Sequence, residues 1–210
     1  MDVEQHWRTI AGQRRALADL LVQLTPAELD APSLCAGWRI RDVAAHVALA
    51  PQPPGPLGLL RETVRARGSF HRLNHDLAVR HADTVPDPAA DLARVADSRR
   101  LPVVTNYRNI HYDVIVHAQD IARPLGRTIE VAPAAAAVAA TRVWTMGWPF
   151  WARRTYRHVH LIADDASFTV GAGPEIRGST VDLLLLLTGR RSVLPLLRGA
   201  GLELLDPVSP

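Results

Sequence analysis

Residues 103–126 have the sequence VVTNYRNIHYDVIVHAQDIARPLG, in which apolar side chains recur every three or four positions. This spacing gives a helix one continuous apolar stripe. The members of the stripe are Val103, Tyr107, Ile110, Val114, Ala118, Ile121 and Leu125. Pro124 and Gly126 end the pattern, as is usual at a helix C-terminus. The sequence therefore predicts a long helix with one buried face, against which other helices must pack.

A line of polar side chains lies beside this stripe. At 100° per residue and with Val114 at the centre of the buried face, His117 lies about 60° away and Asp113 about 100° away on the same side. Asn106 and Asp120 fall on that edge as well. Polar groups that face a protein interior need partners. Because residues four apart are neighbours on a helix, Asp113 and His117 are placed to bind one cation together.

Further helices are predicted on the N-terminal side. They are expected at residues 3–24, in a short stretch from Pro26, and at residues 38–50, 57–81 and 87–100. Thr25 followed by Pro26 is a typical helix start. Four prolines prevent the helix at 38–50 from continuing, because proline lacks the N–H that a helix interior requires: Pro51, Pro53, Pro54 and Pro56.

The C-terminal part has a different pattern. An alanine-rich helix is predicted from Pro133 to Met146. Residues 158–162 and 167–170 indicate two strands joined by a turn, and residues 181–187 indicate a helix. The chain is therefore expected to be mainly α, with a helical bundle over residues 1–152 and a small α+β domain over residues 153–210.

The helix at 38–50 offers a third metal ligand. With Val43 at the centre of its buried face, His46 lies about 60° from that centre, again at the edge of the core. Two histidines and one carboxylate leave coordination positions open, as in catalytic rather than structural zinc sites. A single histidine at a core edge is more often a satisfied polar group, however, and the D-x-x-x-H spacing also arises by chance. Spacing alone leaves both interpretations open.

Other candidate residues are less specific. Asp42 and Asp120 are spaced to orient the imidazoles of His46 and His117, or to lie in solvent. His71 and His75 are also four residues apart, but their helix is polar and a solvated face is the favoured interpretation. For Cys35, a structural thiol is favoured over a nucleophile. It is the only cysteine, which excludes an intrachain disulfide and a thiolate-rich zinc site.

The composition argues against several classes of protein. The net charge is only +3, and all 24 basic residues are arginines spread along the chain, so a nucleic-acid partner is not expected. No stretch approaches the roughly 20 apolar residues of a membrane span, so no membrane partner is expected. The first residues lack the basic and apolar regions of a secretory signal, from which we expect a cytoplasmic location.

Two ordered motifs resemble a known family. Residues 24–30 (LTPAELD) and 33–46 (SLCAGWRIRDVAAH) resemble the opening of the mycothiol-dependent maleylpyruvate isomerase family, within the DinB-like superfamily. Residues 113–122 (DVIVHAQDIA) resemble its second motif. Short segments near the C-terminus are also similar to that family's small domain: LIADD at 161–165, GSTVDLL at 178–184 and TGR at 188–190.

The resemblance implies a DinB-like up-and-down bundle with a small C-terminal α+β domain. It also implies that His46, Asp113 and His117 bind a divalent metal, with zinc the expected ion. At the position of Asp113 the family usually has glutamate, so the carboxylate of this chain is one methylene shorter. By its position in the motif at 188–190, Arg190 is the candidate contact for a thiol cofactor.

The activity that the resemblance implies is thiol chemistry. Mycothiol or a similar low-molecular-weight thiol would act as cosubstrate, and the chain would isomerise a small electrophile or transfer the thiol to it, as a monomer or homodimer. Two alternatives remain open at this point. One is a thiol-independent hydrolase or lyase in which the metal activates water. The other is a bundle that binds a small molecule without catalysis.

Overall fold

The computed structural model describes residues 1–52, 55–102 and 105–205. Of the residues discussed above, Pro53, Pro54 and Val103 lie outside these ranges. The chain forms two compact units, which divide between Ile129 and Glu130. Each unit is described by itself.

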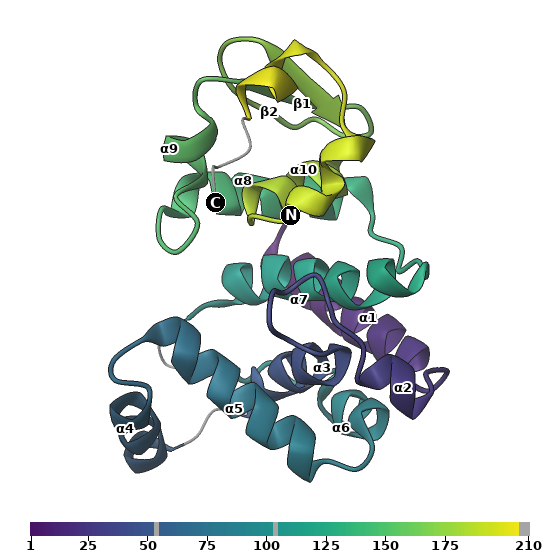
Figure 1. Cartoon of the computed structure of the whole chain (residues 1–210), viewed down its shortest axis with the longest axis vertical. Coiled ribbons are helices and arrows are strands. Elements are labelled where there is room, and N and C mark those ends of the chain that lie inside the picture. The colour runs from purple at the N-terminus through teal and green to yellow at the C-terminus, as the bar shows by residue number, and fades with distance from the viewer. Residues whose placement is uncertain (53–54, 103–104, 206–210) are drawn as a thin grey trace. The chain divides into compact units, whose positions relative to one another are not determined.

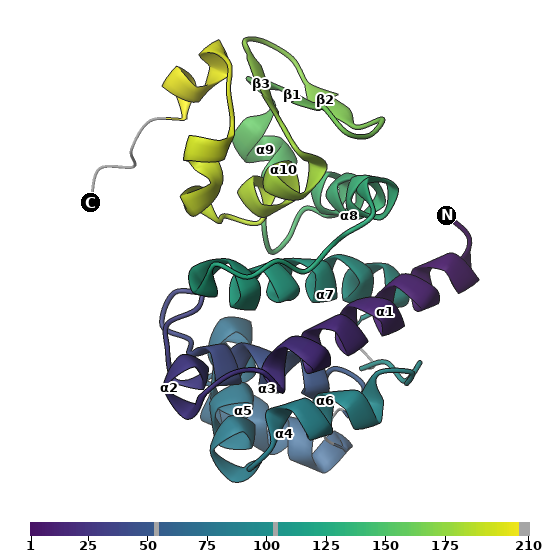
Figure 2. The ribbon, with the colours of Figure 1, turned by 90° about the vertical axis from the view of Figure 1, so that its right-hand side faces the viewer.

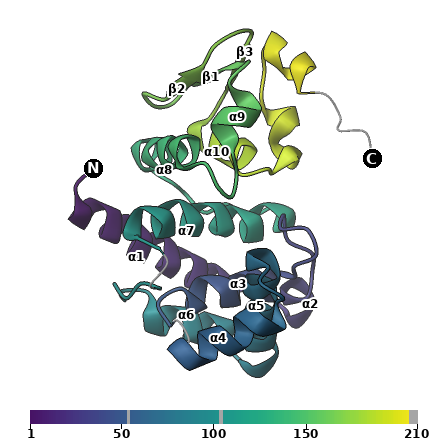
Figure 3. The same cartoon turned by 90° about the vertical axis from the view of Figure 1, so that its left-hand side faces the viewer.

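The first unit is entirely helical in its described residues. Its elements are α1 (Val3–Leu21), α2 (Pro26–Leu29), α3 (Ile40–Leu49), α4 (Pro56–Arg65), α5 (Phe70–Thr84), α6 (Pro88–Val95), α7 (Tyr107–Ala122) and the short 3-10 helix η1 (Arg123–Leu125). Helices α1 and α3 both pack against α7, α6 packs against α1 and α3, and α5 covers α3 (Figures 1 and 2). Helix α4 lies beside α5 (Figure 3).

The apolar stripe of α7 forms the centre of this unit. Ile110, Val114, Ala118 and Ile121 are all buried, as predicted. Ile115 and Val116 are buried as well, so α7 is enclosed on more than the single face that was expected. The helix begins at Tyr107 because the Asn106 side chain accepts hydrogen bonds from the next two free backbone N–H groups, those of residues 108 and 109. Asn106 is therefore a helix cap rather than a member of the polar line.

Other predicted helices differ at their ends. The helix expected over residues 57–81 is two helices, α4 and α5, because Arg67 and Gly68 adopt positive φ angles of 50° and 72° and break the helix. Ser69 then caps α5 by accepting from the Arg72 N–H. The helix expected to reach residue 100 ends at Val95. The capped start at Thr25 and Pro26 is confirmed.

The second unit combines helices with a small sheet. Its elements are α8 (Pro133–Met146), α9 (Ala152–Tyr156), β1 (His160–Ala163), β2 (Thr169–Gly171), β3 (Glu175–Gly178), α10 (Thr180–Leu187) and the 3-10 helices η2 (Arg191–Leu196) and η3 (Ala200–Leu204). The predicted hairpin is present, since β1 and β2 pair antiparallel with Leu161 opposite Val170. Strand β3, which pairs parallel to β1 on its other side, was not predicted.

The division into units differs from the boundary expected at residues 152 and 153. Helix α8 belongs with the C-terminal elements because its alanine face packs against α10. Ala136, Ala139 and Ala140 are fully buried there, as is the run of leucines at 183–186. The fold is mainly helical with one small sheet, as expected. Among the described helices, none has both the length and the apolar content needed to cross a bilayer.

Candidate metal centre

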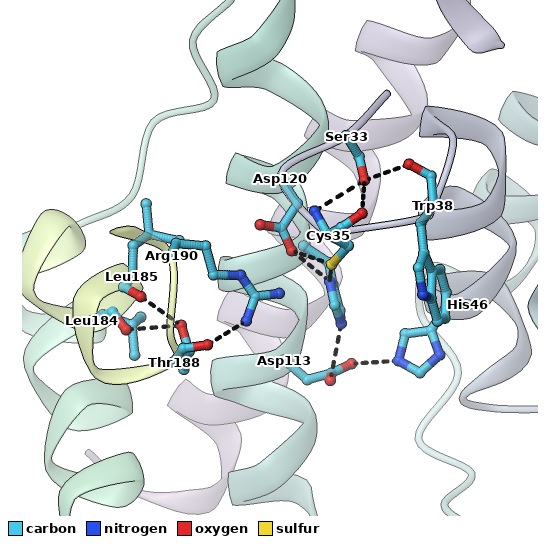
Figure 4. Close-up of polar contacts among 11 residues, drawn as sticks. Ser33, Cys35, Trp38, His46, Asp113, Asp120, Leu184, Leu185, Thr188 and Arg190 are labelled. Atoms are coloured by element: carbon cyan, nitrogen blue, oxygen red, sulfur yellow. Dashed lines mark hydrogen bonds and ion pairs between the residues drawn. The ribbon is translucent and has the colours of Figure 1, made fainter. Parts of the chain in front are cut away.

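Helices α3 and α7 bring His46, Asp113 and His117 together, and Figure 4 shows His46 and Asp113 turned toward each other. The two oxygens of the Asp113 carboxylate point to different histidines: Oδ2 lies 3.6 Å from His46 Nε2, and Oδ1 lies 3.4 Å from His117 Nε2. The two imidazole rings stand nearly perpendicular, with centroids 4.8 Å apart. The three side chains singled out from helix periodicity therefore form one cluster.

The distances in this cluster fit a shared cation. Both N···O separations exceed the roughly 2.7–3.2 Å of a good N–H···O hydrogen bond. Ligands about 2.0–2.2 Å from one tetrahedral ion lie about 3.3–3.6 Å from each other. Two imidazoles and one carboxylate are also a donor set that zinc accepts. One donor atom from each of the three side chains lies within 4.8 Å of the other two, so the residues present can hold a divalent ion, with the two oxygens of Asp113 facing different histidines.

The cluster is partly open to solvent. The exposed fractions of the side chains are 22% for His46, 25% for Asp113 and 13% for His117. Three protein ligands with this exposure leave room for a further ligand from solution, which is the arrangement of catalytic rather than structural zinc sites.

Asp120 fixes the orientation of the His117 ring. Its carboxylate is fully buried, and its Oδ2 lies 2.8 Å from His117 Nδ1. The carboxylate accepts the Nδ1–H, so the lone pair of Nε2 is directed toward Asp113. The orienting role considered for Asp120 is met in the geometry.

Asp42 has a different role from the one considered for it. Its buried carboxylate accepts from the Arg39 backbone N–H at 2.8 Å and from the Arg39 guanidinium at 2.8 and 3.0 Å. These contacts satisfy the exposed donors at the first turn of α3. Asp42 therefore stabilises the start of the helix that carries His46 and is engaged by Arg39 rather than by the imidazole.

The charges in the cluster act on each other. Burial opposes ionisation of Asp113, but the nearby His117 and His46 outweigh it and hold the pKa of Asp113 below its ordinary value. Burial likewise opposes protonation of His117, but Asp113, Asp120 and Cys35 outweigh it and raise the pKa of His117 well above its ordinary value. The cluster therefore favours a positive charge between Asp113 and the imidazoles, whether that charge is a proton or a metal ion.

Cys35, for which the sequence favours a structural thiol, lies beside this cluster. Its Sγ donates to Asp120 Oδ2 at 3.1 Å and lies 3.8 Å from His117 Nδ1. Cys35, His117 and Asp120 form a second group of possible metal donors, but their 2.8 Å N···O contact is a hydrogen bond rather than the spacing of two ligands. The sequence offers one signal that Cys35 lies near the metal ligands, because this residue belongs to the same motif as His46.

The turn that carries Cys35 also carries Trp38, whose indole packs against His46. The Leu34 N–H donates to the Asp120 carbonyl at 3.1 Å, and the Ser33 hydroxyl donates to the Trp38 carbonyl at 3.0 Å. The Trp38 indole meets the His46 ring edge to face at 5.6 Å (Figure 4). It also meets the His75 ring, with centroids at the same distance. His75 thus packs against Trp38, while His71 remains exposed as predicted.

Arg190 lies in the second unit, directly after α10. Its Nη1 donates to the Thr188 carbonyl at 2.8 Å, and its backbone N–H donates to the Leu185 carbonyl at 2.9 Å (Figure 4). The Thr188 hydroxyl in turn donates to the carbonyls of Leu184 and Leu185. The arginine is therefore part of the hydrogen-bonded C-terminus of α10.

Comparisons with known proteins agree with this architecture. The family model "Mycothiol maleylpyruvate isomerase N-terminal domain" matches residues 10–122. The crystal structure of a mycothiol-dependent maleylpyruvate isomerase matches with a TM-score of 0.63 and 16% identity, over 100% of this chain and 97% of that one. The structure of a histidine-to-alanine mutant of such an enzyme matches over the same shares, with a TM-score of 0.56 and 16% identity. A search of curated protein sequences found no match.

Proposed function

Because the chain belongs to the mycothiol maleylpyruvate isomerase N-terminal domain family, we propose that it is a metal-dependent enzyme that uses a low-molecular-weight thiol to isomerise a small electrophile, or that transfers the thiol to such a substrate. The observation that carries this proposal is the convergence of His46, Asp113 and His117 at ligand spacing in a partly exposed cluster. Mycothiol is the proposed thiol and zinc the proposed ion.

The proposed ligands are Nε2 of His46, Nε2 of His117 and the Asp113 carboxylate. When bound, a divalent ion supplies a Lewis acid that favours the thiolate form of a thiol at neutral pH. Asp113 is the only anionic residue among the three ligands, so a divalent ion would keep part of its charge available to an anionic sulfur. Asp120 keeps the His117 proton on Nδ1. Isomerisation and transfer of the thiol then differ in whether the thiol leaves after the substrate has reacted.

We also propose Arg190 as a hydrogen-bond donor to the polar hydroxyl or amide oxygens of the thiol. A guanidinium presents several N–H donors in a fixed planar geometry, and its charge is permanent. The bond from Arg190 to the Thr188 carbonyl gives the side chain a defined direction. Arg190→Ala should raise the KM for the thiol while metal content stays the same, and an unchanged KM would remove Arg190 from the proposed site.

The test of the metal site is elemental analysis of protein purified without chelator. We expect about one divalent ion per chain in the wild type, and loss of that ion in His46→Ala and His117→Ala. His81→Ala is the matched control, because His81 also pairs with a carboxylate, Asp91, but lies outside the cluster. Retention of the full metal content in both cluster variants would refute the assignment.

The thiol requirement is tested separately with the metal-loaded protein. Maleylpyruvate is the natural first substrate, given the similarity described above, and its turnover should require added mycothiol. Turnover without any thiol would instead indicate metal-assisted hydrolysis or lysis. Small-molecule binding that is unaffected by complete metal removal, together with no turnover by the metal-loaded protein, would favour a binding protein over an enzyme.

A further inference from the structure

Helix α4 presents an apolar stripe to solvent. Leu57, Leu60 and Val64 have exposed fractions of 84%, 62% and 68%. At 100° per residue they fall within about 60° of one another on the helix surface. A surface helix of a globular protein normally turns such a stripe toward the core, so this exposure requires an explanation.

The opposite side of α4 carries a buried charge. Glu62 lies about 170° from the centre of the stripe, and only 6% of its side chain is exposed. Its Oε1 accepts from Arg65 at 3.1 Å and from Arg61 at 3.3 Å, while its Oε2 contacts Arg80 of α5. Because Arg80 of the neighbouring helix α5 engages this carboxylate, the inward position of Glu62 and the outward position of the stripe are set by the packing of α4 on the bundle.

The charge around the stripe is strongly positive. Residues 55–72 contain four arginines and one glutamate, so their net charge is 4 − 1 = +3. Arg67 and Arg72 are exposed, and the side chains of Arg61 and Arg65 remain 68% and 55% exposed although they contact Glu62. A second copy of the same face would carry the same charge and be repelled. The charge complement of this face is a surface that is both anionic and apolar.

We propose that α4 attaches the protein peripherally to an anionic lipid surface. The stripe would enter the boundary between headgroups and acyl chains, and the flanking arginines would bind lipid phosphates. We favour a lipid surface over an acidic protein because an apolar stripe flanked by arginines is the pattern of helices that lie in the interface of anionic membranes. None of the described helices can span a bilayer, but a contact at the membrane surface needs no spanning segment.

The test is co-sedimentation of the full chain with lipid vesicles. We expect binding to phosphatidylcholine vesicles that contain about one quarter phosphatidylglycerol, and about tenfold weaker binding to pure phosphatidylcholine. The double variant Leu60→Ser/Val64→Ser should lose about tenfold in binding to the anionic vesicles. Val22→Ser is the matched control and should bind like the wild type, because Val22 is 74% exposed at the end of α1, away from the stripe.

Other outcomes would overturn the proposal. Absence of binding to the anionic vesicles would do so directly. Equal binding by the wild type and the double variant, together with equal binding to soluble polyglutamate, would reduce the effect to nonspecific charge attraction. A dimer in size-exclusion chromatography that the double variant abolishes would assign the stripe to a second copy. An unchanged circular-dichroism spectrum of the double variant shows that it is folded, so the metal proposal stands or falls independently.

Discussion

His117 is the residue on which the candidate centre depends most. Its Nε2 faces Asp113 at 3.4 Å, and its Nδ1 is hydrogen-bonded to Asp120 at 2.8 Å. The same Asp120 oxygen also accepts the Cys35 thiol at 3.1 Å. One imidazole is therefore constrained at both nitrogens. The hydrogen bond at Nδ1 leaves Nε2 as the nitrogen that is free to bind a metal, and it raises the basicity of Nε2.

Asp120→Asn tests this support at the residue scale. The neutral amide removes the anionic acceptor of the His117 Nδ1–H, so we expect metal affinity to fall by about 10–100-fold while the metal still binds. A competition titration with a chromogenic chelator measures the change. Asp91→Asn is the matched control, since Asp91 lies 2.7 Å from His81 Nε2 outside the cluster. Equal metal affinity in Asp120→Asn and the wild type would contradict the prediction.

Among the elements, the packing of α1 on α7 contains a titratable group in its interior. His6 of α1 is 4% exposed and packs edge to face against two rings of α7, Tyr107 at 5.1 Å and His111 at 4.6 Å. Burial lowers the pKa of His6, and the N-terminal amine and Arg108 lower it further. The folded protein therefore keeps His6 neutral at a pH where the unfolded chain protonates it.

The sign of the pH effect follows from this lowered pKa. The contribution of neutral His6 to stability is fully present above the pKa of about 6.5 that this residue has in the unfolded chain. It is lost as the pH falls through the lower pKa that His6 has in the folded protein. Urea denaturation between pH 7.5 and pH 5 should show a smaller loss of unfolding free energy in His6→Phe than in the wild type. His71→Phe, at an exposed histidine, should leave the loss unchanged. Equal acid sensitivity in His6→Phe and the wild type would exclude this origin.

In the whole molecule, the candidate centre belongs to one compact unit. Its three donors come from α3 and α7, both in the unit that ends at Ile129. A bound ion would therefore link two helices whose ligands, His46 and Asp113, are 67 residues apart in the sequence (113 − 46). Binding that favours the folded state adds to the stability of this unit by mass action.

Removal of the metal should consequently lower the melting temperature. At free metal about 100 times its Kd, the lost stabilisation is about 2.7 kcal/mol, and for a unit of this size the shift is roughly 5–10 °C. Calorimetry with and without chelator measures it. The melting temperature of His46→Ala should be the same with and without chelator. A chelator effect of equal size in His46→Ala would show that the stabilising ion binds elsewhere.

Local features of the sequence determined much of the helical fold and the three candidate ligands. The stripe of α7, the capped start at Thr25 and the helix from Pro133 were predictable because each depends on side chains within a few turns of chain. The same periodicity placed His46, Asp113 and His117 at the edges of buried faces, since the angle between residues on one helix is fixed by its geometry.

Only the tertiary structure decided which of these edges meet. The 3.4 and 3.6 Å approaches of Asp113 to the two histidines, and the contact of Cys35 with Asp120, depend on how α3 and the turn before it pack against α7. Strand β3 needs β1 as its partner, because its single buried apolar residue, Ile176, gives no pattern of its own. The outward position of the α4 stripe likewise depends on Arg80 of another helix. Interactions between residues distant in sequence have no local periodicity, and for that physical reason the chain's local pattern does not reveal them.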